Sequence, residues 1–243
     1  MEQCNIKGSV DSIETFGLVD GPGIRTVIFL NGCSLRCKYC HNPEMWDLKD
    51  KNYSVSDVVS RILRSKPYFK NGGGATFSGG EPLMQSEFLL ECAKKLKENG
   101  IHVAIDTAGI CKNFNSEIFK YIDLVLLDIK HITKDGFNDV TSRDYFDMYM
   151  KFLEELNKSN IEVWIRQVIV PGIHDNVTYM KDLVKFIKNN IKNVKRVDFL
   201  PYHKLGSEKY EALGLTYPYK DKEEMNKDKC DELYKIFMED FNN

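Results

Sequence analysis

The sequence predicts an α/β protein, a (β/α)6-like open partial TIM barrel in which parallel strands are flanked by outer helices. Short apolar runs recur along the chain, segments with helical periodicity separate them, and no linker or repeat interrupts the alternation. Such an alternation favours parallel strands joined by right-handed crossovers. Six strand–helix units are too few to close an eight-stranded barrel, and a doubly wound open sheet is the alternative. We expect residues 1–243 to form one domain.

The individual elements follow from these patterns in chain order. An N-terminal stretch over about 5–16 is expected to form one or two short strands. Apolar runs then predict buried parallel strands over residues 26–30, 75–77, 103–106, 124–129, 163–170 and 197–200. Helical periodicity predicts helices over residues 56–69, 86–99, 116–121, 145–158, 177–190 and 223–241.

Local signals support some of these boundaries. Ser54 and Asp57 have the spacing of a capping box in front of the first helix. Ser86 precedes an apolar stripe that stops at Asn99 and Gly100, where a helix would end. The polar segment 204–227, which holds several tyrosines and glycines, is expected to be an extended surface loop.

Composition and charge exclude several classes of function. The chain has 243 residues, of which 42% are hydrophobic and 29% charged, with a formal net charge of -2. This balance provides no field to hold nucleic acid or an anionic membrane. No apolar run approaches the roughly 20 residues of a membrane span, and the first eight residues lack the apolar segment of a signal peptide. We therefore expect a cytoplasmic protein, without nucleic-acid or membrane partners, whose seven cysteines are mostly reduced.

Three of the cysteines lie close together after the first parallel strand, in residues 32–44, here called the cluster loop. Cys33, Cys37 and Cys40 can converge on one centre, and thiolates favour zinc, copper(I) or iron–sulfur clusters. Zinc usually takes four protein ligands, and His41 could be the fourth. A [4Fe-4S] cluster held by three cysteines would leave one iron open to a ligand that is not protein. Core thiols without a metal are a further interpretation.

The spacing C-x3-C-x2-C, with the aromatic Tyr39 before the last cysteine, resembles the signature of the radical S-adenosylmethionine (SAM) superfamily. Motifs along nearly the whole chain resemble the activating enzymes of glycyl radical enzymes, most closely those that act on pyruvate formate-lyase. These motifs are Asp20-Gly-Pro-Gly-Ile-Arg25, Tyr39-Cys-His-Asn-Pro-Glu44, Ser78-Gly-Gly-Glu-Pro82, Ile105-Asp-Thr107, Leu127-Asp-Ile-Lys130, Val163-Trp-Ile-Arg-Gln167 and Leu200-Pro-Tyr-His203. The resemblance implies that a reduced [4Fe-4S] cluster cleaves SAM, and that the resulting 5′-deoxyadenosyl radical removes hydrogen from a glycine of a partner enzyme.

The resemblance also implies which residues form the site. It implies that Cys33, Cys37 and Cys40 are the ligands of the [4Fe-4S] cluster. It implies SAM contacts from Tyr39, Cys40, His41, Gly79, Gly80, Glu81, Asp106, Asp128, Ile129, Lys130, Arg166 and His203, with Asn42 as a weaker candidate. It further implies a monovalent cation, Na+ or K+, held by Asp106, Thr107, the Leu126 carbonyl and Asp128, and a substrate-loop role for Asp20 and Arg25.

The residue chemistry is compatible with these roles but does not require them. Paired glycines let a ligand approach the backbone, and oxygen ligands suit a hard cation. Arg166 lies in an apolar strand, where its charge needs a partner or a ligand. The alternatives are a plain turn after the strand at Ser78, an Asp/Lys ion pair that ties adjacent strands together at Asp106, Asp128 and Lys130, a salt bridge at Arg166, and a rigid β-turn near Asp20.

The length between two motifs favours one protein substrate. Residues 41–77 hold no cysteine, whereas activators of many other glycyl radical enzymes carry a ferredoxin-like insertion there. Pyruvate formate-lyase is therefore the expected partner. SAM cleavage needs a low reduction potential, so flavodoxin or ferredoxin is the expected reductant.

The alternative functions are the activator of a different glycyl radical enzyme, another radical SAM enzyme, a zinc-stabilised binding protein and a noncatalytic relative. Cys4, Cys92, Cys111 and Cys230 have no partner spacing, and Cys92 and Cys230 fit small buried hydrophobes.

Overall fold

The structure is a computed structural model that describes residues 6–242. A seven-stranded sheet runs through it. Cys4 and the first residue of the expected N-terminal strand region lie outside the described residues. The strand order is β2 (Val10–Gly17), β3 (Arg25–Leu30), β5 (Gly74–Gly79), β6 (His102–Thr107), β7 (Leu124–Asp128), β8 (Glu162–Ile169) and β9 (Val194–Pro201). β2 pairs antiparallel with β3, and the strands from β3 to β9 are parallel. The predicted α/β class and the six parallel strands are confirmed.

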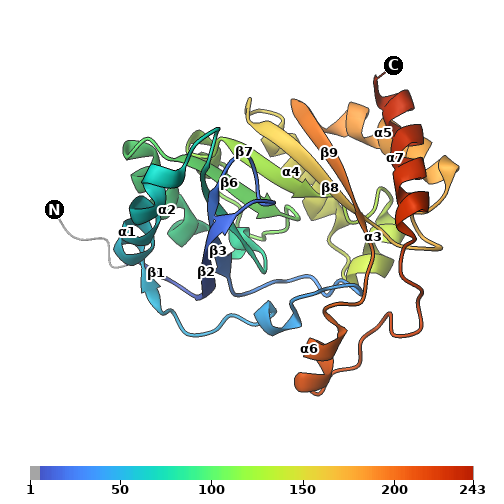
Figure 1. The fold of residues 1–243 in the computed structure, drawn as a ribbon, viewed down its shortest axis with the longest axis horizontal. Coiled ribbons are helices and arrows are strands. Elements are labelled where there is room, and N and C mark those ends of the chain that lie inside the picture. Colours follow the sequence, from blue (N-terminus) through green and yellow to red (C-terminus); the bar gives the residue numbers. More distant parts are fainter. Residues whose placement is uncertain (1–5, 243) are drawn as a thin grey trace.

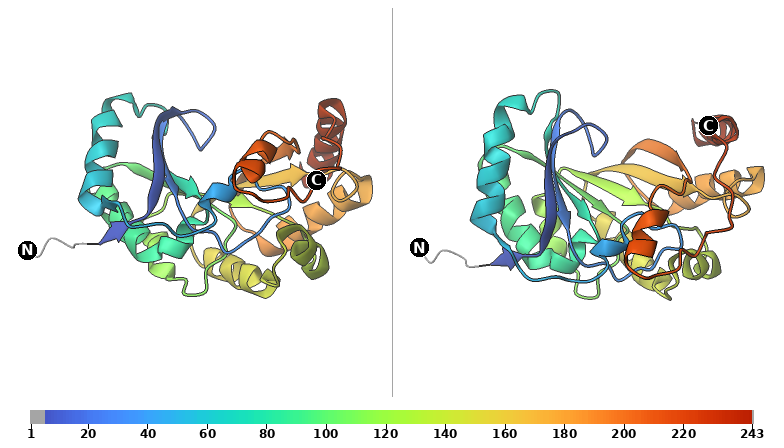
Figure 2. Two further views of the ribbon diagram at one scale, coloured as in Figure 1. Left: turned by 90° about the horizontal axis from the view of Figure 1, so that it is seen from below. Right: turned by 60° about the horizontal axis from the view of Figure 1, so that its bottom comes forward.

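Helices surround the outside of the curved sheet, and the sheet does not close on itself (Figures 1 and 2). The α-helices are α1 (Val55–Ser65), α2 (Ser86–Glu98), α3 (Lys134–Thr141), α4 (Phe146–Leu156), α5 (Val177–Asn190), α6 (Ser207–Ala212) and α7 (Lys227–Asn242). The 3-10 helices are η1 (Pro43–Met45), η2 (Lys66–Tyr68), η3 (Pro82–Gln85) and η4 (Ser116–Lys120). A short antiparallel ribbon pairs β1 (Lys7–Gly8) with β4 (Tyr53–Ser54). No helix within residues 6–242 is long and apolar enough to cross a membrane. That residues 1–243 form one domain stays a prediction.

The predicted capping box opens α1. The Ser54 hydroxyl accepts from the Asp57 amide at 3.2 Å, and the Asp57 carboxylate accepts from the Ser54 amide at 3.0 Å. Such reciprocal bonds satisfy two donors that the helix itself leaves free. The helix boundaries were otherwise predicted to within a few residues. The exceptions are α1, which ends at Ser65 before η2, and α7, which begins at Lys227.

Three expectations need correction. Residues 116–120 form a 3-10 helix rather than an α-helix. Helix α3 occupies a stretch with no predicted element. The segment 204–227 is not an extended surface loop, because it contains α6 and buries Tyr210, Tyr217 and Tyr219. Within the segment the rings of Tyr210 and Tyr217 meet edge-on, and a hydrogen bond between the hydroxyls of Tyr202, next to the end of β9, and Tyr217 ties the segment to the sheet.

Alternation along the strands separates the core from the functional face. On the outer face, residues such as Phe77, Ile105 and Leu127 belong to the large core beneath the helices. On the inner face, Ala104, Leu124 and Leu126 form a second small cluster with Trp164. Side chains two residues apart share a face of a strand, so Asp106 and Asp128 continue this inner face at the carboxyl ends of β6 and β7. These strand ends position the site.

Candidate functional site

A cavity of about 190 Å³ lies at the carboxyl ends of the parallel strands. It brings together most of the residues that the motifs single out, although they come from four separate segments. The predicted site residues that line it are Cys33, Cys37, Tyr39, Cys40, His41, Asn42, Gly79, Gly80, Glu81, Asp106, Thr107, Asp128 and Lys130. The carboxyl edge of such a sheet is where ligands bind in α/β folds.

Backbone hydrogen bonds fix the two ends of the cluster loop against each other. The amide of Gly32 donates to the Met45 carbonyl at 2.8 Å, and that of Cys33 donates to the Trp46 carbonyl at 2.9 Å. Gly32 has a φ of 95°, a conformation that residues with a Cβ rarely adopt. The Arg36 guanidinium donates to the Cys33 carbonyl at 2.6 Å. The positions of the cysteines are therefore set by the backbone of the loop.

Helix α3, which the sequence did not predict, supports the cluster loop from the other side. The Arg36 amide donates to the Thr141 carbonyl at 3.0 Å, and the Lys38 amide donates to the Val140 carbonyl at 2.9 Å. The Arg143 guanidinium donates to the Ser34 carbonyl at 3.0 Å. A weak signal for α3 exists, because Thr133 caps it and Phe137 and Val140 follow at helical spacing.

The three thiols face one cavity but do not converge on one point. Burial raises the pKa of Cys33 and of Cys37 to about 12, and it also raises the pKa of Cys40. No group of three or more His, Cys, Asp or Glu side chains within residues 6–242 is arranged to hold a single metal ion. Thiolates in a buried site need a positively charged centre. Three thiols around a common space suit a cluster, in which each iron takes its own cysteine.

The Gly-Gly-Glu loop after β5 packs tightly between strand β3 and the cluster loop. The Gly80 amide donates to the Leu30 carbonyl and the Glu81 amide to the Gly32 carbonyl, both at 2.8 Å. A Cβ on Gly80 would lie 2.3 Å from the Gly32 carbonyl oxygen, a backbone atom that cannot move aside. Gly79 has a φ of 107°. Only glycine therefore fits these two positions.

The Glu81 carboxylate is directed into the protein. Its Oε1 accepts from the Thr107 hydroxyl at 2.5 Å and from the Leu83 amide at 3.2 Å, while Oε2 accepts from the Ala108 amide at 2.9 Å. Burial raises the pKa of Glu81 to about 7 although these three donors favour the ionised form. Glu81 thus ties the loop after β5 to the loop after β6. Glu81 also lines the cavity and its Oε2 accepts only one of these bonds, so the SAM contact expected of Glu81 stays a prediction.

Paired charges lie at the ends of β6 and β7 and at Arg166 within the neighbouring strand β8. The Asp106 carboxylate accepts from the Ser78 hydroxyl at 2.8 Å and lies 3.3 Å from the Arg166 guanidinium. Lys130 donates to Asp128 at 2.7 Å, and its ammonium lies 5.7 Å from the centre of the Tyr39 ring. The salt bridge that the sequence left as one alternative for Arg166 is present, and a role of Arg166 toward SAM stays a prediction.

The pKa shifts of these groups have clear causes. Burial raises the pKa of Asp106 to about 6, with Arg166 opposing the shift and Asp128 adding to it. Burial alone would lower the pKa of Lys130, but the Asp128 carboxylate outweighs it and raises that pKa well above its usual value. Lys130 therefore stays cationic at the wall of the cavity, where an anionic ligand group would be stabilised.

Four of the predicted contact residues lie beside the cavity rather than on its wall. His203 is one of them, and it packs on His41, which lines the cavity. The centroids of the two rings lie 4.3 Å apart, and His41 Nε2 lies 3.0 Å from the His203 carbonyl oxygen. Arg166 is not among the residues that line the cavity; its guanidinium contacts Asp106, which does line it, and donates to the Val19 carbonyl. The side chains of Leu126 and Ile129 are buried, so only their backbone atoms could contribute.

Asp20 and Arg25 lie outside the cavity, and the structure assigns them different environments. The Asp20 carbonyl accepts from the Thr76 hydroxyl at 2.6 Å. The Arg25 side chain has no solvent exposure and donates to Thr76 Oγ1 at 2.9 Å, to the Gly72 carbonyl at 3.0 Å and to the Ala75 carbonyl. A direct contact of Arg25 with a substrate does not fit this burial; Arg25 instead holds the turn that carries Asp20.

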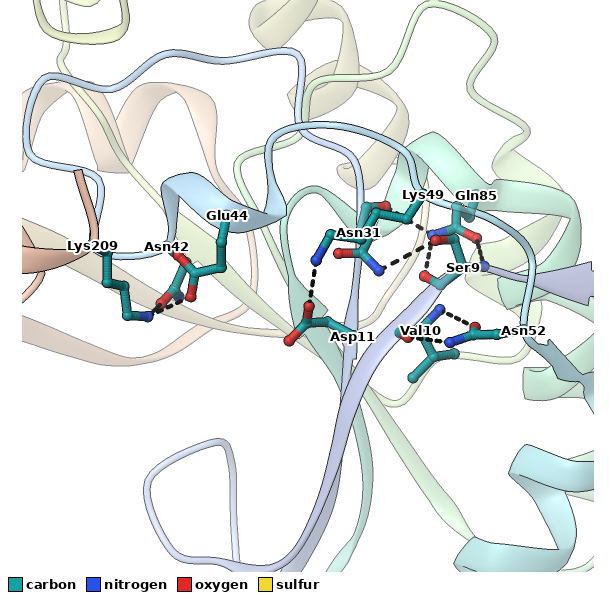
Figure 3. Close-up of polar contacts among 10 residues, drawn as sticks. All are labelled: Ser9, Val10, Asp11, Asn31, Asn42, Glu44, Lys49, Asn52, Gln85 and Lys209. Carbon is teal, nitrogen blue, oxygen red and sulfur yellow. Dashed lines mark hydrogen bonds and ion pairs between the residues drawn. The ribbon is translucent and has the colours of Figure 1, made fainter. Parts of the chain in front are cut away.

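A second segment that sequence analysis missed covers the end of the cluster loop. Lys209 of α6 donates to Asn42 Oδ1 at 2.8 Å and pairs with Glu44 Oε1 at 2.5 Å (Figure 3). Figure 2 shows α6 beside the light-blue segment that contains η1, and the ring of Tyr210 meets Trp46 edge-on. Nothing in the local sequence indicates this contact, because its partners are more than 160 residues apart.

Comparison with known proteins identifies the family. The sequence profile of the radical SAM superfamily matches residues 27–187. The chain belongs to the radical SAM superfamily. Two curated relatives of this radical SAM chain are pyruvate formate-lyase-activating enzymes. That of Clostridium pasteurianum is 49% identical over 238 residues, covering 96% of this chain and 98% of the relative. That of Staphylococcus epidermidis is 42% identical over 240 residues, covering 95% of each.

Solved structures agree on the fold of this radical SAM chain. A radical SAM methyltransferase from Sphaerobacter thermophilus matches with a TM-score of 0.60 at 13% identity, over 96% of this chain and 75% of that one. A domain of the pyruvate-formate lyase-activating enzyme from Bacteroides vulgatus matches with a TM-score of 0.52 at 22% identity, over 69% of this chain and 94% of that one. At these identities the likeness concerns the fold alone. The family assignment argues against the zinc-stabilised alternative.

Proposed function

We propose that this chain activates pyruvate formate-lyase by generating a glycyl radical on it. The observation that carries the proposal is one cavity in which the thiols of Cys33, Cys37 and Cys40 face Asp128 and Lys130. The relatives that match nearly its whole length carry the name of this activity. When bound, a reduced [4Fe-4S] cluster and SAM supply the 5′-deoxyadenosyl radical that takes hydrogen from the partner's glycine.

The residues of the chain divide the binding of these groups between them. The three cysteines hold the cluster and leave one iron position for SAM. Lys130 is placed to neutralise the SAM carboxylate, because it stays cationic beside the cavity. Backbone carbonyls of Gly79 and Gly80 and the Glu81 carboxylate, whose Oε2 accepts a single bond, would accept from the amino group.

The adenosine would lie at the other end of the cavity. Tyr39, Cys40 and His41 line that end, and His203 packs on His41 from outside. Aromatic rings favour stacked contacts with a base, and backbone groups can read its edge. We include Ile129 through its backbone and Arg166 through its hold on Asp106.

A monovalent cation and a substrate loop complete the proposal. Na+ or K+ would bind at Asp106, Thr107, Leu126 and Asp128. For this ion Asp106 and Asp128 would share oxygens that now contact Arg166 and Lys130. The substrate loop would contact Asp20, which Arg25 positions from within the core.

The reaction requires an electron from outside the chain. We propose flavodoxin or ferredoxin as its source, because SAM cleavage needs a cluster at the low end of the roughly -700 to +450 mV range. We also propose a cytoplasmic location, since reduced thiols are required to build the cluster.

Radical transfer tests this function. The enzyme, purified and loaded with cluster without oxygen, is incubated with pyruvate formate-lyase, SAM and dithionite, and the product is measured by electron paramagnetic resonance. We expect a glycyl radical doublet that disappears when SAM is omitted. Lys130→Met should abolish the doublet, whereas the matched variant Lys134→Met, at a half-exposed site on α3, should preserve it. If SAM is cleaved but no doublet forms, pyruvate formate-lyase is not the substrate. If SAM is not cleaved, the proposed reductive cleavage of SAM is refuted.

A further inference from the structure

A groove of about 530 Å³ lies next to the cluster loop and outside the cavity. Six segments line it: the N-terminal ribbon, Ser34 of the cluster loop, residues 48–51, the start of α2 with the preceding η3, the loop after β6, and Tyr145 before α4. Its apolar lining includes Ile6, Leu48, Met84, Phe88 and Ile110, of which Leu48 and Met84 are exposed, and its lysines are Lys7, Lys51 and Lys112. The activity proposed above leaves this groove without a role.

The backbone of the cluster loop separates the groove from the cavity. Cys33 lines the cavity and its neighbour Ser34 lines the groove. On the groove side, a Cβ at Gly32 would lie 3.3 Å from Leu48 Cδ1 and 3.7 Å from Met84 Cε. Leu48 and Met84 therefore cover the residue that precedes the first cluster cysteine. A molecule in the groove comes within one residue of Cys33 without passing through the space that SAM needs.

The floor of this groove is held in place by buried hydrogen bonds. Gln85 accepts from the Ser9 amide at 2.8 Å and donates to the Ser9 carbonyl at 2.9 Å and the Asn31 carbonyl at 2.8 Å (Figure 3). These bonds join Ser9, between β1 and β2, to Asn31, which follows β3, and to the approach to α2. A docking partner would meet a formed surface, which lowers the entropic cost of binding.

The charge of the groove indicates what kind of partner fits. Lys7, Lys51 and Lys112 are exposed, and none has an ion-pair partner among the described residues. Glu87 is the one acid that lines the groove. Leu48 and Met84 are 53% and 41% exposed. An apolar centre with unpaired lysines around it complements an acidic protein surface, in a chain whose overall charge is -2.

We propose that an acidic one-electron carrier protein docks in this groove and reduces the cluster from there. The proposal rests on the function proposed above. The carrier loses one electron and the [4Fe-4S]2+ cluster gains it, with no bond or proton transferred. Electron tunnelling weakens steeply with distance, so a docking surface one residue from Cys33 suits the step. Redox encounters of this kind are small and transient, which a single groove can provide.

Charge reversal of the three lysines tests the proposal. The triple variant Lys7→Glu, Lys51→Glu and Lys112→Glu is compared with a matched control in which Lys181, Lys185 and Lys235 on α5 and α7 become Glu. Both variants change the net charge equally. The dissociation constant for oxidised flavodoxin and for oxidised ferredoxin is measured with the cluster-loaded proteins at two salt concentrations. Cluster reduction by each reduced carrier is followed by stopped-flow absorbance.

The groove variant should bind at least one carrier about ten-fold more weakly than the control at low salt. The difference should shrink near 0.5 M salt, where the Debye length falls to several Å. Its reduction by the carrier should slow similarly, while reduction by dithionite should not change. Equal carrier binding by the two variants would overturn the proposal, as would an equal loss with dithionite. A different result would refute the proposed function: the dithionite-reduced enzyme would form no glycyl radical on pyruvate formate-lyase.

Discussion

The buried Arg25 allows a quantitative prediction. Arg25→Met removes the donors to Thr76, to the Gly72 carbonyl and to the Ala75 carbonyl. A buried acceptor left without a donor costs about 1–3 kcal/mol, so the two carbonyls lose about 2–6 kcal/mol. Part of this is offset because burial of the guanidinium is itself unfavourable and lowers the pKa of Arg25 to about 10. We expect a net loss of about 3 kcal/mol in the free energy of unfolding.

The assay is urea unfolding of the cluster-free protein under reducing conditions, followed by circular dichroism. Arg61→Met, the same change at an exposed position of α1, is the control and should lie within about 0.5 kcal/mol of the wild type. Folded Arg25→Met should retain SAM cleavage, because Arg25 lies outside the cavity. A loss of stability no larger than that of the control would refute this account of Arg25.

Three further predictions concern the cluster, acid stability and helix α6. Cys37→Ala should lower the iron content after reconstitution to near zero, whereas the control Cys92→Ala, at a buried position in α2, should retain the wild-type iron content. Equal iron contents in the two variants would contradict the assignment of Cys37 as a cluster ligand. Burial lowers the pKa of His174 to about 3, against about 6.5 unfolded, so acid favours the unfolded chain. From pH 7 to pH 5 the wild type should lose about 2 kcal/mol more unfolding free energy than His174→Gln, and parallel losses would refute this. Lys209→Met should speed amide hydrogen exchange in α6, and Lys195→Met should not.

The fold could be predicted where the deciding interactions are local in sequence. Strand β7 is buried over Leu124–Leu127 and reads as an apolar run whatever its neighbours are. The capping box at Ser54 lies within four residues of chain. Such elements carry their own signal, because periodicity and end chemistry are properties of short windows.

The errors arose where distant contacts decide the structure. Helix α6 has six residues, too few to be stable alone, and it is held by Lys209 with Asn42 and Glu44 and by Tyr210 with Trp46. Helix α3 likewise depends on the cluster loop, to which its carbonyls bond.

The site shows the same division. The ordered motifs identified the residues that line the cavity, because the cluster loop follows β3, the motifs at Gly79, Asp106 and Asp128 end β5, β6 and β7, and parallel strands end at one edge. They did not indicate that the Glu81 carboxylate points inward, since its partners Thr107 and Ala108 belong to the next strand and loop. Nor did they reveal the full burial of Arg25, which depends on β5.

The central claim is that three cysteines hold a four-iron cluster with one iron left for SAM. Mössbauer spectroscopy of protein loaded without oxygen with the Mössbauer-active iron isotope tests it most directly. We predict about four iron and four sulfide per chain, in a [4Fe-4S] spectrum in which one iron site changes when SAM is added. A spectrum without such a cluster, or one in which every iron site stays the same after SAM is added, would contradict the account.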